Sequence, residues 1–175
     1  MHRLSSLAPT LLLGAVLLVA GCTRFTEGTN LSCPRAVFLG GTDTLVRFAP
    51  DAARTERNVA AQFELYDMQY SCRISSRRAE ANVTFAVSGM RRSSAVAENH
   101  EVPYFIVVTN QQGAVVAKHN FTARLRFPAG GNAATITERV EVTLPLAEGQ
   151  RAVGFELVVG IQLTREELDY NLARR

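Results

Sequence analysis

The chain has 175 residues, of which 47% are hydrophobic, so it is long enough and apolar enough to build the core of one domain. It carries 19 Lys and Arg against 16 Asp and Glu, which gives a formal net charge of +3 at pH 7. An excess this small gives no reason to expect a nucleic acid as a partner, and none is predicted. The sequence contains no motif typical of a nucleotide or cofactor site, so no cofactor is predicted either.

The first 21 residues have the layout of a secretory signal. A short, positively charged start at residues 1–4 precedes an apolar segment at residues 11–20 that ends in small residues. The apolar segment has about half of the roughly 20 residues that a membrane-spanning helix needs, so a transmembrane helix is not expected. One interpretation is a signal that is simply cleaved, with Cys22 incidental to it.

The four residues Val19-Ala20-Gly21-Cys22 resemble the lipobox of bacterial lipoproteins, in which an aliphatic residue and two small ones precede a cysteine. The resemblance implies that residues 1–21 are removed and that Cys22 becomes the first mature residue. Its thiol would then carry a diacylglyceryl group, and the acyl chains would hold the protein to a membrane. Thr23, rather than Asp, follows the cysteine, which in Gram-negative lipoproteins implies the periplasmic face of the outer membrane.

Residues 22–32 are predicted to be the lipidated cysteine and a flexible tether without secondary structure, because this stretch is polar and rich in turn-forming residues. Ten residues reach at most about 35 Å when fully extended. The folded domain, predicted over residues 33–163, is therefore expected to lie close to the membrane.

Two cysteines remain, Cys33 and Cys72, in a chain that the signal directs to an oxidising compartment. We expect them to form a disulfide that closes a loop of about 40 residues and stabilises the fold by roughly 4 kcal/mol. The alternative is a pair of buried free thiols. A metal site would need more ligands than His100 and His119 can add, so none is predicted. His119 is expected to be a hydrogen-bonded histidine of the core.

An alternation of apolar and polar residues, the pattern of half-buried strands, begins after Cys33. It predicts strands at residues 36–39, 44–48, 59–65, 68–74 and 81–88. The alternation changes phase at Tyr66 and Asp67, which predicts a bulge or a bend there. Residues 51–58 are charged and are expected to form a loop or one helical turn, and Cys72 is expected to face the core.

The second half of the chain continues the same pattern. Residues 89–101 are predicted to be the longest polar connection of the domain, and residues 102–109 a central strand covered on both faces. Residues 110–113 are expected to form a hairpin turn, with Gly113 placed for a positive φ. Further strands are predicted at residues 117–127, 136–144 and 155–163.

Together these patterns predict an all-β protein, an antiparallel immunoglobulin-like β-sandwich of seven or eight strands, with a closed small barrel as the alternative. Thr164 and Glu167 form a capping box that opens a short C-terminal helix over residues 164–175. This helix is expected to dock on its own sandwich rather than on a partner. Residues 160–167, together with the lipobox, resemble uncharacterised proteobacterial lipoproteins, and this resemblance implies no activity.

The candidate binding residues are Arg91, Arg92 and His100, because long loops on rigid sandwiches often carry recognition. The two arginines are otherwise expected at a solvated strand end. Ser93 and Ser94 share the loop with His100, a combination that invites a hydrolase interpretation. No G-x-S-x-G motif surrounds either serine, so no catalytic residue is predicted.

The predicted function is that of a non-enzymatic, lipid-anchored module that binds another envelope protein or supports an envelope assembly. Exposed strand edges or the connection over residues 89–101 would provide the contact surface. The alternative is a lipoprotein that binds a small molecule or a glycan in a cleft between loops. A pocket lined by convergent polar groups would favour this alternative, whereas an uncovered edge strand would favour the protein-binding module.

Overall fold

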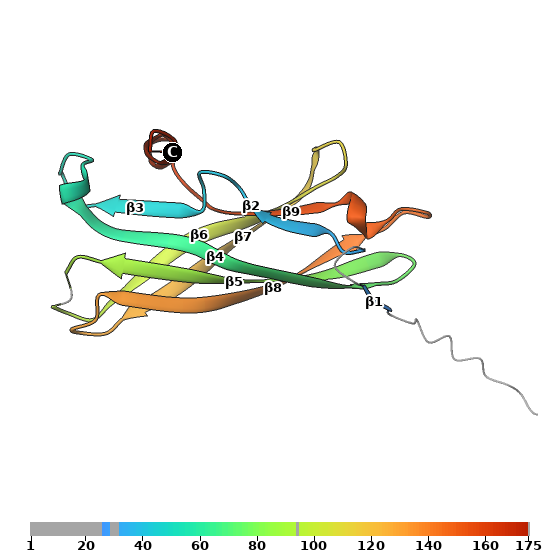
Figure 1. The fold of residues 1–175 in the computed structure, drawn as a ribbon, viewed down its shortest axis with the longest axis horizontal. Coiled ribbons are helices and arrows are strands. Elements are labelled where there is room, and N and C mark those ends of the chain that lie inside the picture. The colour runs from blue at the N-terminus through green and yellow to red at the C-terminus, as the bar shows by residue number, and fades with distance from the viewer. Residues whose placement is uncertain (1–25, 29–31, 94, 175) are drawn as a thin grey trace, which may run out of the picture.

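The computed structural model describes residues 26–28, 32–93 and 95–174, which form two stacked β-sheets with one helix beside them (Figure 1). The strands are β1 (Thr26–Gly28), β2 (Arg35–Phe38), β3 (Thr44–Phe48), β4 (Val59–Ile74), β5 (Arg78–Arg91), β6 (Glu98–Thr109), β7 (Val115–Phe127), β8 (Ala133–Pro145) and β9 (Glu156–Ile161). The helices are two 3-10 turns, η1 (Glu56–Asn58) and η2 (Ala152–Gly154), and the α-helix α1 (Arg165–Leu172). None of the described helices is long and apolar enough to cross a membrane.

The strands divide into two sheets. The first sheet has the order β1-β4-β5-β8, with β3 also paired to β4, and the second has the order β2-β9-β6-β7. Every described pair is antiparallel except β2 with β9, which is parallel. The predicted antiparallel sandwich with a short C-terminal helix is therefore confirmed, and the alternative of a closed barrel is wrong.

The alternation in the sequence places one face of each sheet in a shared core. In β5, every second residue from Ala79 to Val87 is fully buried. The ring of Phe85 in this row packs edge-on against Phe38 of β2 and Tyr104 of β6, with ring centres 6.1 and 5.3 Å away. Each buried side chain of this size contributes about 1.5–3 kcal/mol, so these inward rows hold the two sheets together.

The predicted bulge near Tyr66 is confirmed. β4 is one strand of 16 residues where the sequence predicts two, and its pairing with β5 shifts register between Tyr66 and Gln69. Asp67 has a φ of 52°, in the left-handed region that aspartate tolerates better than most residues. The shift lets the apolar residues on both sides of it face the core, because a register change of one residue reverses the alternation.

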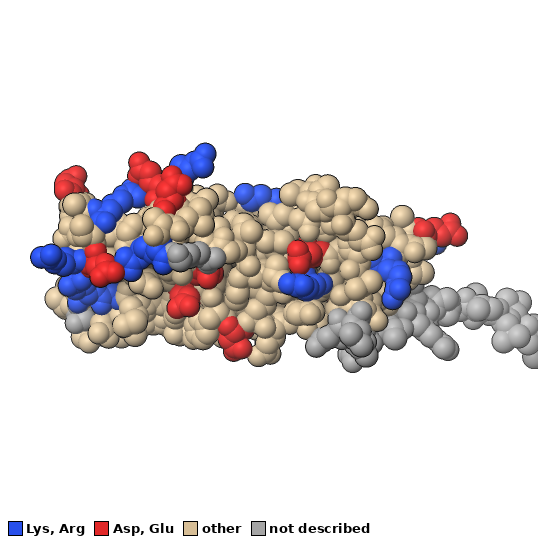
Figure 2. Space-filling view, turned by 45° about the horizontal axis from the view of Figure 1, so that its top comes forward, with Lys and Arg blue, Asp and Glu red and all other residues tan. Residues whose placement is uncertain are grey.

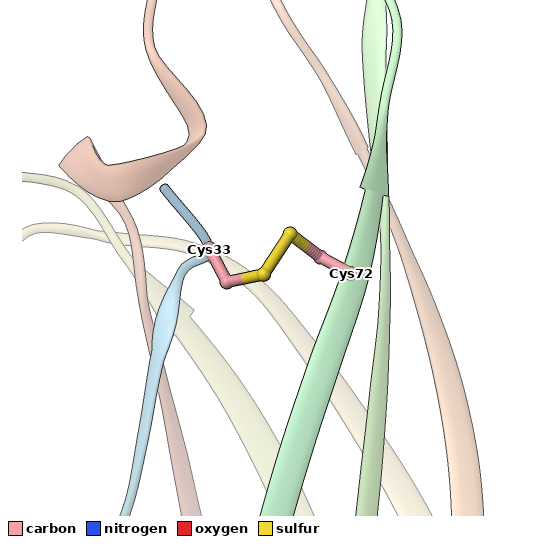
Figure 3. The surroundings of a disulfide bond; sticks show 2 residues. All are labelled: Cys33 and Cys72. Carbon is pink, nitrogen blue, oxygen red and sulfur yellow. A yellow bond between two sulfur atoms is a disulfide. The ribbon is translucent and has the colours of Figure 1, made fainter. Parts of the chain in front are cut away.

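The predicted disulfide is also confirmed. Cys33 precedes β2 in one sheet and Cys72 lies in β4 of the other, and their bond joins the two sheets (Figure 3). Both residues are buried, as expected for Cys72, and they lie 39 positions apart in the sequence. The bridge therefore fixes the two layers to each other at the end of the sandwich where β1 lies.

The segment predicted to be an unstructured tether contains the strand β1. Its three residues pair antiparallel with Cys72 to Ile74 at the end of β4, so the prediction for residues 22–32 is wrong for these positions. Backbone pairing with a neighbouring strand does not depend on side-chain polarity, which is why composition gives no sign of it. Cys22 and the predicted signal lie outside the described residues.

Residues 89–101 do not form one long polar connection, so that prediction is wrong. β5 continues to Arg91 and β6 begins at Glu98, which leaves only residues 92–97 between the strands. The inward-facing positions of this stretch hold a glycine, an arginine and a histidine. The apolar alternation that would reveal a strand is therefore missing, although the strands are present.

The next two strands match the predictions except at one residue. β6 lies between β7 and β9, which confirms its central position, and Gly113 has a φ of 75° in the predicted turn. His119, however, is exposed, so its prediction as a core histidine is wrong. It belongs to the inward row of β7, but the opposite sheet does not bury the first half of this strand, where Ala117 and Phe121 are only half-buried.

The predicted capping box of α1 is confirmed. Thr164 N donates to Glu167 Oε2 at 2.8 Å, and Glu167 N donates to Thr164 Oγ1 at 3.2 Å. The helix docks on its own sandwich, as predicted, because Asn171 Nδ2 donates to the carbonyl oxygens of Gly41 and Thr44 at 2.9 and 2.7 Å.

Candidate functional sites: an arginine-lined cavity and an open edge strand

A cavity of about 560 Å³ lies at the end of the sandwich where β4 begins and β5 ends. Phe48, Val59 and Ala60 form part of its apolar wall. Its charged and imidazole lining consists of Arg47, Arg57, Arg91, Arg92, Glu98 and His100. In Figure 2 charged side chains gather over this end of the molecule, at the left, whereas the middle of that face is largely uncharged.

Arg91 is buried, with 6% of its surface exposed, so its prediction as a residue of a solvated strand end is wrong. Its Nη2 donates to the carbonyl oxygens of Val96, Pro128 and Gly131 at 2.7, 3.0 and 2.9 Å. Its Nη1 donates to the Glu98 carboxylate at 3.2 Å. A buried guanidinium is tolerated only when it is paired and hydrogen-bonded, and these partners meet that need. Arg91 therefore holds two loops against the end of β5.

The His100 side chain is 13% exposed and lies between the rings of Phe63 and Phe127, with ring centres 5.3 and 5.2 Å away. Its Nε2 is 3.2 Å from Glu98 Oε2, but the two are not aligned for a hydrogen bond, and this buried nitrogen has no hydrogen-bond partner among the described residues. The hydrogen bond from Arg91 is the main reason why the pKa of Glu98 is lowered from its ordinary value of 4.5. Glu98 therefore faces Arg91 as a carboxylate at neutral pH.

The other three arginines of the cavity have no carboxylate partner within the described part of the chain. Arg47 Nη2 donates to the carbonyl oxygen of Glu101 at 2.9 Å. Arg92 Nε donates to the carbonyl oxygen of Val59 at 3.0 Å. Arg57 belongs to η1 and is exposed. The cavity is thus lined by three arginines that no described carboxylate neutralises.

The structure brings the three sequence-predicted binding candidates together, because Arg91, Arg92 and His100 all line this cavity. Ser93 lines it as well, whereas Ser94 lies outside the described residues. The three candidates differ in their surroundings. Arg91 is enclosed by loop carbonyls, Arg92 is exposed, and His100 is packed between aromatic rings.

Two further arginines of the cavity, Arg47 and Arg57, are not identified by sequence reasoning. They come from β3 and from the turn before β4, far along the chain from Arg91, Arg92 and His100, and no short motif connects them. Only the pairing of β3 with β4 places them at the same end. As for metals, the described residues contain no group of three or more His, Cys, Asp and Glu that could hold an ion.

The second candidate feature is the free edge of β7, one of the two outer strands of its sheet, β2 being the other. No described strand pairs with this edge. From Val115 to Thr122 the residues are exposed or half-buried on both faces. Val115 and Val116 are 64% and 51% exposed. An edge strand presents a row of unpaired N–H and C=O groups, which can pair with a strand from another chain.

The register of the sheet identifies the backbone groups of β7 that point to its free edge. The carbonyl oxygen of Pro103 in β6 accepts a hydrogen bond from Gln162 N at 2.8 Å, so this residue faces away from β7. The next residue, Tyr104, therefore faces β7, where it pairs with Phe121. Because successive residues of a strand point their backbone groups in opposite directions, the amide of Asn120 points to the free edge.

Two of the three Lys and Arg side chains of β7, those of Lys118 and Arg124, are turned away from this edge. Lys118 extends across the outer face of the sheet, where its Nζ donates to Gln162 Oε1 at 3.0 Å and lies 5.1 Å from the ring centre of Phe105. Arg124 Nε donates to Glu101 of β6 at 3.1 Å. Both cations are thus turned toward neighbouring strands of the same sheet.

β8, an outer strand of the other sheet, has different side chains along its edge. Glu138 lies on its inward row and accepts a hydrogen bond from the Tyr104 hydroxyl at 2.8 Å. Burial, reinforced by Glu138, raises the pKa of Tyr104 above its ordinary value. Pro145, which ends the strand, has no amide to donate. Inward-pointing charges and edge prolines are features that discourage pairing with another strand.

Comparison of the chain with protein-family models, with curated proteins and with solved structures finds no match. The arginine-lined cavity and the free edge of β7 are therefore the features from which a function is inferred.

Proposed function

We propose that the protein is a lipid-anchored, non-enzymatic module that binds an extended segment of another envelope protein along the free edge of β7. The observation that carries this proposal is the edge itself, which pairs with no described strand and from which Lys118 and Arg124 are turned away. A segment that adds to such an edge as a further strand gains main-chain hydrogen bonds, and its alternate side chains give specificity.

The edge favours a partner segment with apolar residues and at least one acidic residue. Val115 and Val116 offer exposed apolar surface at the start of β7. Lys118 and Arg126 have no carboxylate partner among the described residues. Lys118 is turned toward Gln162, so Arg126 is the cation that remains for the added strand. Opposite charges on adjacent strands contribute roughly 0.2–1 kcal/mol per pair, so an acidic residue beside Arg126 would stabilise that strand.

The position of β1 supports a membrane-adjacent placement of the domain. β1 begins at Thr26, four residues after Cys22, and four residue steps span at most about 14 Å. A lipid on Cys22 would therefore hold the end of the sandwich at which β1 pairs with β4 beside the bilayer. Because Thr23 follows the cysteine, we place the protein on the periplasmic face of the outer membrane.

The strand-addition proposal is tested with two variants of one residue. Asn120→Pro removes an outward amide without removing a hydrogen bond between β6 and β7, whereas Asn120→Ala keeps that amide and removes the side chain. Partners of the unaltered protein are first identified by crosslinking in native envelopes and mass spectrometry. We expect the yield of the partner crosslink to fall about tenfold in Asn120→Pro, a loss of about 1.4 kcal/mol, and less than about twofold in Asn120→Ala.

Three results would contradict the proposal. An equal loss in Asn120→Pro and Asn120→Ala would assign the contact to the side chain rather than to the backbone edge. Crosslinks only between copies of this chain would replace the partner by a dimer. The absence of protein partners together with a bound metabolite would favour the alternative of a small-molecule-binding lipoprotein.

The anchor has its own test. We expect the first peptide of the protein recovered from native membranes to begin at Cys22 and to carry the mass of the acyl groups. A bare thiol on Cys22 in that peptide would contradict the anchor, and it would leave the strand-addition proposal to be judged by the Asn120 variants alone.

A further inference from the structure

We propose that the cavity between β3, β4, β5 and β6 binds the phosphoryl group of a small organic ligand, an activity separate from the strand addition proposed for β7. Arg47, Arg57 and Arg92 line the cavity, and none of them has a carboxylate partner in the described ranges of the chain. Guanidinium groups bind phosphates and carboxylates through pairs of parallel hydrogen bonds, so this cluster is suited to an oxyanion.

The nearby acidic side chains do not neutralise these three arginines, because each of them is paired with another cation. The pairs are Glu98 with Arg91 at 3.2 Å, Glu56 with Arg174 at 2.9 Å and Glu101 with Arg124 at 3.1 Å. A phosphate monoester carries a charge of about −1.5 to −2 at pH 7, whereas a carboxylate carries a single charge. Three unpaired guanidinium groups therefore match a phosphoryl group better than one carboxylate.

Two of the three arginines are held in place while keeping free donors. Arg47 uses Nη2 for the carbonyl oxygen of Glu101, and its guanidinium lies 5.9 Å from the centre of the Phe63 ring. Arg92 donates from Nε and Nη2 to the carbonyl oxygens of Val59 and Glu56 at 3.0 and 3.3 Å. A guanidinium has five N–H donors, so each retains several for a ligand. Side chains held in this way lose less conformational entropy on binding.

The cavity also has room for an apolar portion of the ligand. Its volume of about 560 Å³ lies within the range of about 300–1,000 Å³ that is typical of small-molecule sites. Phe48, Val59 and Ala60 provide apolar wall beside the arginines. His100 lines the same cavity, and its buried Nε2, which lies 3.2 Å from the Glu98 carboxylate, makes no aligned hydrogen bond within the described structure.

The site is tested by isothermal titration of the full-length protein in detergent with phenyl phosphate, which combines a phosphoryl group with an apolar ring. Arg57→Gln removes one cation of the cavity. Arg77→Gln is the matched control, since Arg77 is an exposed arginine at the opposite end of β4 and β5. We expect the Kd for phenyl phosphate to rise about tenfold in Arg57→Gln and less than about twofold in Arg77→Gln. Benzoate, with the same ring and a single negative charge, is expected to bind about tenfold more weakly than phenyl phosphate.

A deacylated phosphatidylglycerol head group, which is a phosphodiester, distinguishes the two sources of such a ligand. Tighter binding of the monoester would assign the site to a soluble phosphorylated compound, and tighter binding of the diester to a lipid head group. Either result supports a phosphoryl site if Arg57→Gln weakens the binding of that probe. Absence of binding by both probes, or equal weakening by Arg57→Gln and Arg77→Gln, would overturn the proposal while leaving the strand-addition proposal untouched.

Discussion

β7 and β8 are outer strands of different sheets and have the same length, 13 residues each, but their side chains protect the free edges differently. β8 turns Glu138 into the sandwich and ends on a proline. β7 carries its cations on the outer face, where Lys118 and Arg124 bond to residues of neighbouring strands. The direction in which charged side chains point, rather than their number, therefore decides whether they protect an edge from pairing.

Removal of the disulfide is expected to have the largest effect, and it tests whether both edges depend on the sheets being held together. Cys33→Ala should lower the free energy of unfolding in oxidising buffer by about 4 kcal/mol, because the bridge restricts a long loop of the unfolded chain. The measurement is urea denaturation, with wild-type protein under reducing conditions as the control. Two equivalents of free thiol in the native wild-type protein would contradict the bridge.

A substitution at Gly89 of β5 tests how tightly the two sheets pack near both outer strands, since Gly89 pairs with Ala134 of β8 and faces the Phe127 ring of β7. A side-chain carbon at this position would lie 2.8 Å from the Phe63 ring and 2.9 Å from the Phe127 ring. Gly89→Ala should therefore destabilise the protein by about 1–3 kcal/mol in thermal or urea unfolding. Ser88→Ala, one position along the strand, is the control, and equal stability of both variants would show that the rings can move aside.

The hydrogen bond between the Tyr104 hydroxyl and Glu138 holds the inward-pointing carboxylate of β8. Tyr104→Phe should cost about 1–2 kcal/mol, because Glu138 loses its hydrogen-bond donor in a half-buried position. The raised pKa of Tyr104 means that its contribution is present below its ordinary value of 10.0 and is lost as the pH rises through the folded-state pKa. Tyr66→Phe, at an exposed tyrosine, is the control. If both variants unfold alike at neutral pH, the pair does not stabilise β8.

The smallest expected effect is a pH dependence at the turn between β7 and β8, which Arg91 holds. The lowered pKa of Glu98 means that its contribution to stability is present above its ordinary value of 4.5 and is lost as the pH falls through the lower folded-state pKa. Unfolding measured across the acid range should therefore be less pH-dependent in Glu98→Gln than in wild type. The same acid slope in both proteins would contradict the pairing of Glu98 with Arg91.

Most strands are predictable from the sequence because their inward positions are apolar and alternate with polar residues. The rows from Ala79 to Val87 and from Ala123 to Phe127 show this alternation and are buried. The bulge at Asp67 is predictable for the same reason, since it is visible as a change of phase. The disulfide is predictable because the signal-like start of the sequence predicts an oxidising compartment and because two cysteines remain besides Cys22.

The parts that the sequence does not reveal depend on contacts between distant residues. Arg91 occupies an inward position because carbonyl oxygens of Val96, Pro128 and Gly131 converge on it, and no local pattern announces these partners. His119 occupies a position in the apolar row of β7, as a core residue would. It is exposed because the opposite sheet does not cover that half of β7. The cavity cannot be predicted from the sequence for the same reason, because its arginines are brought together by strand pairing.

The most direct test of the β7 edge compares photocrosslinking amino acids placed at Asn120 of β7 and at Thr137 of β8, in the full-length protein and in native envelopes. Both positions lie on outer strands and are exposed. We predict that the probe at Asn120 captures a partner protein and that the probe at Thr137 does not. Capture of the same partner at both positions, or only at Thr137, would contradict strand addition at β7.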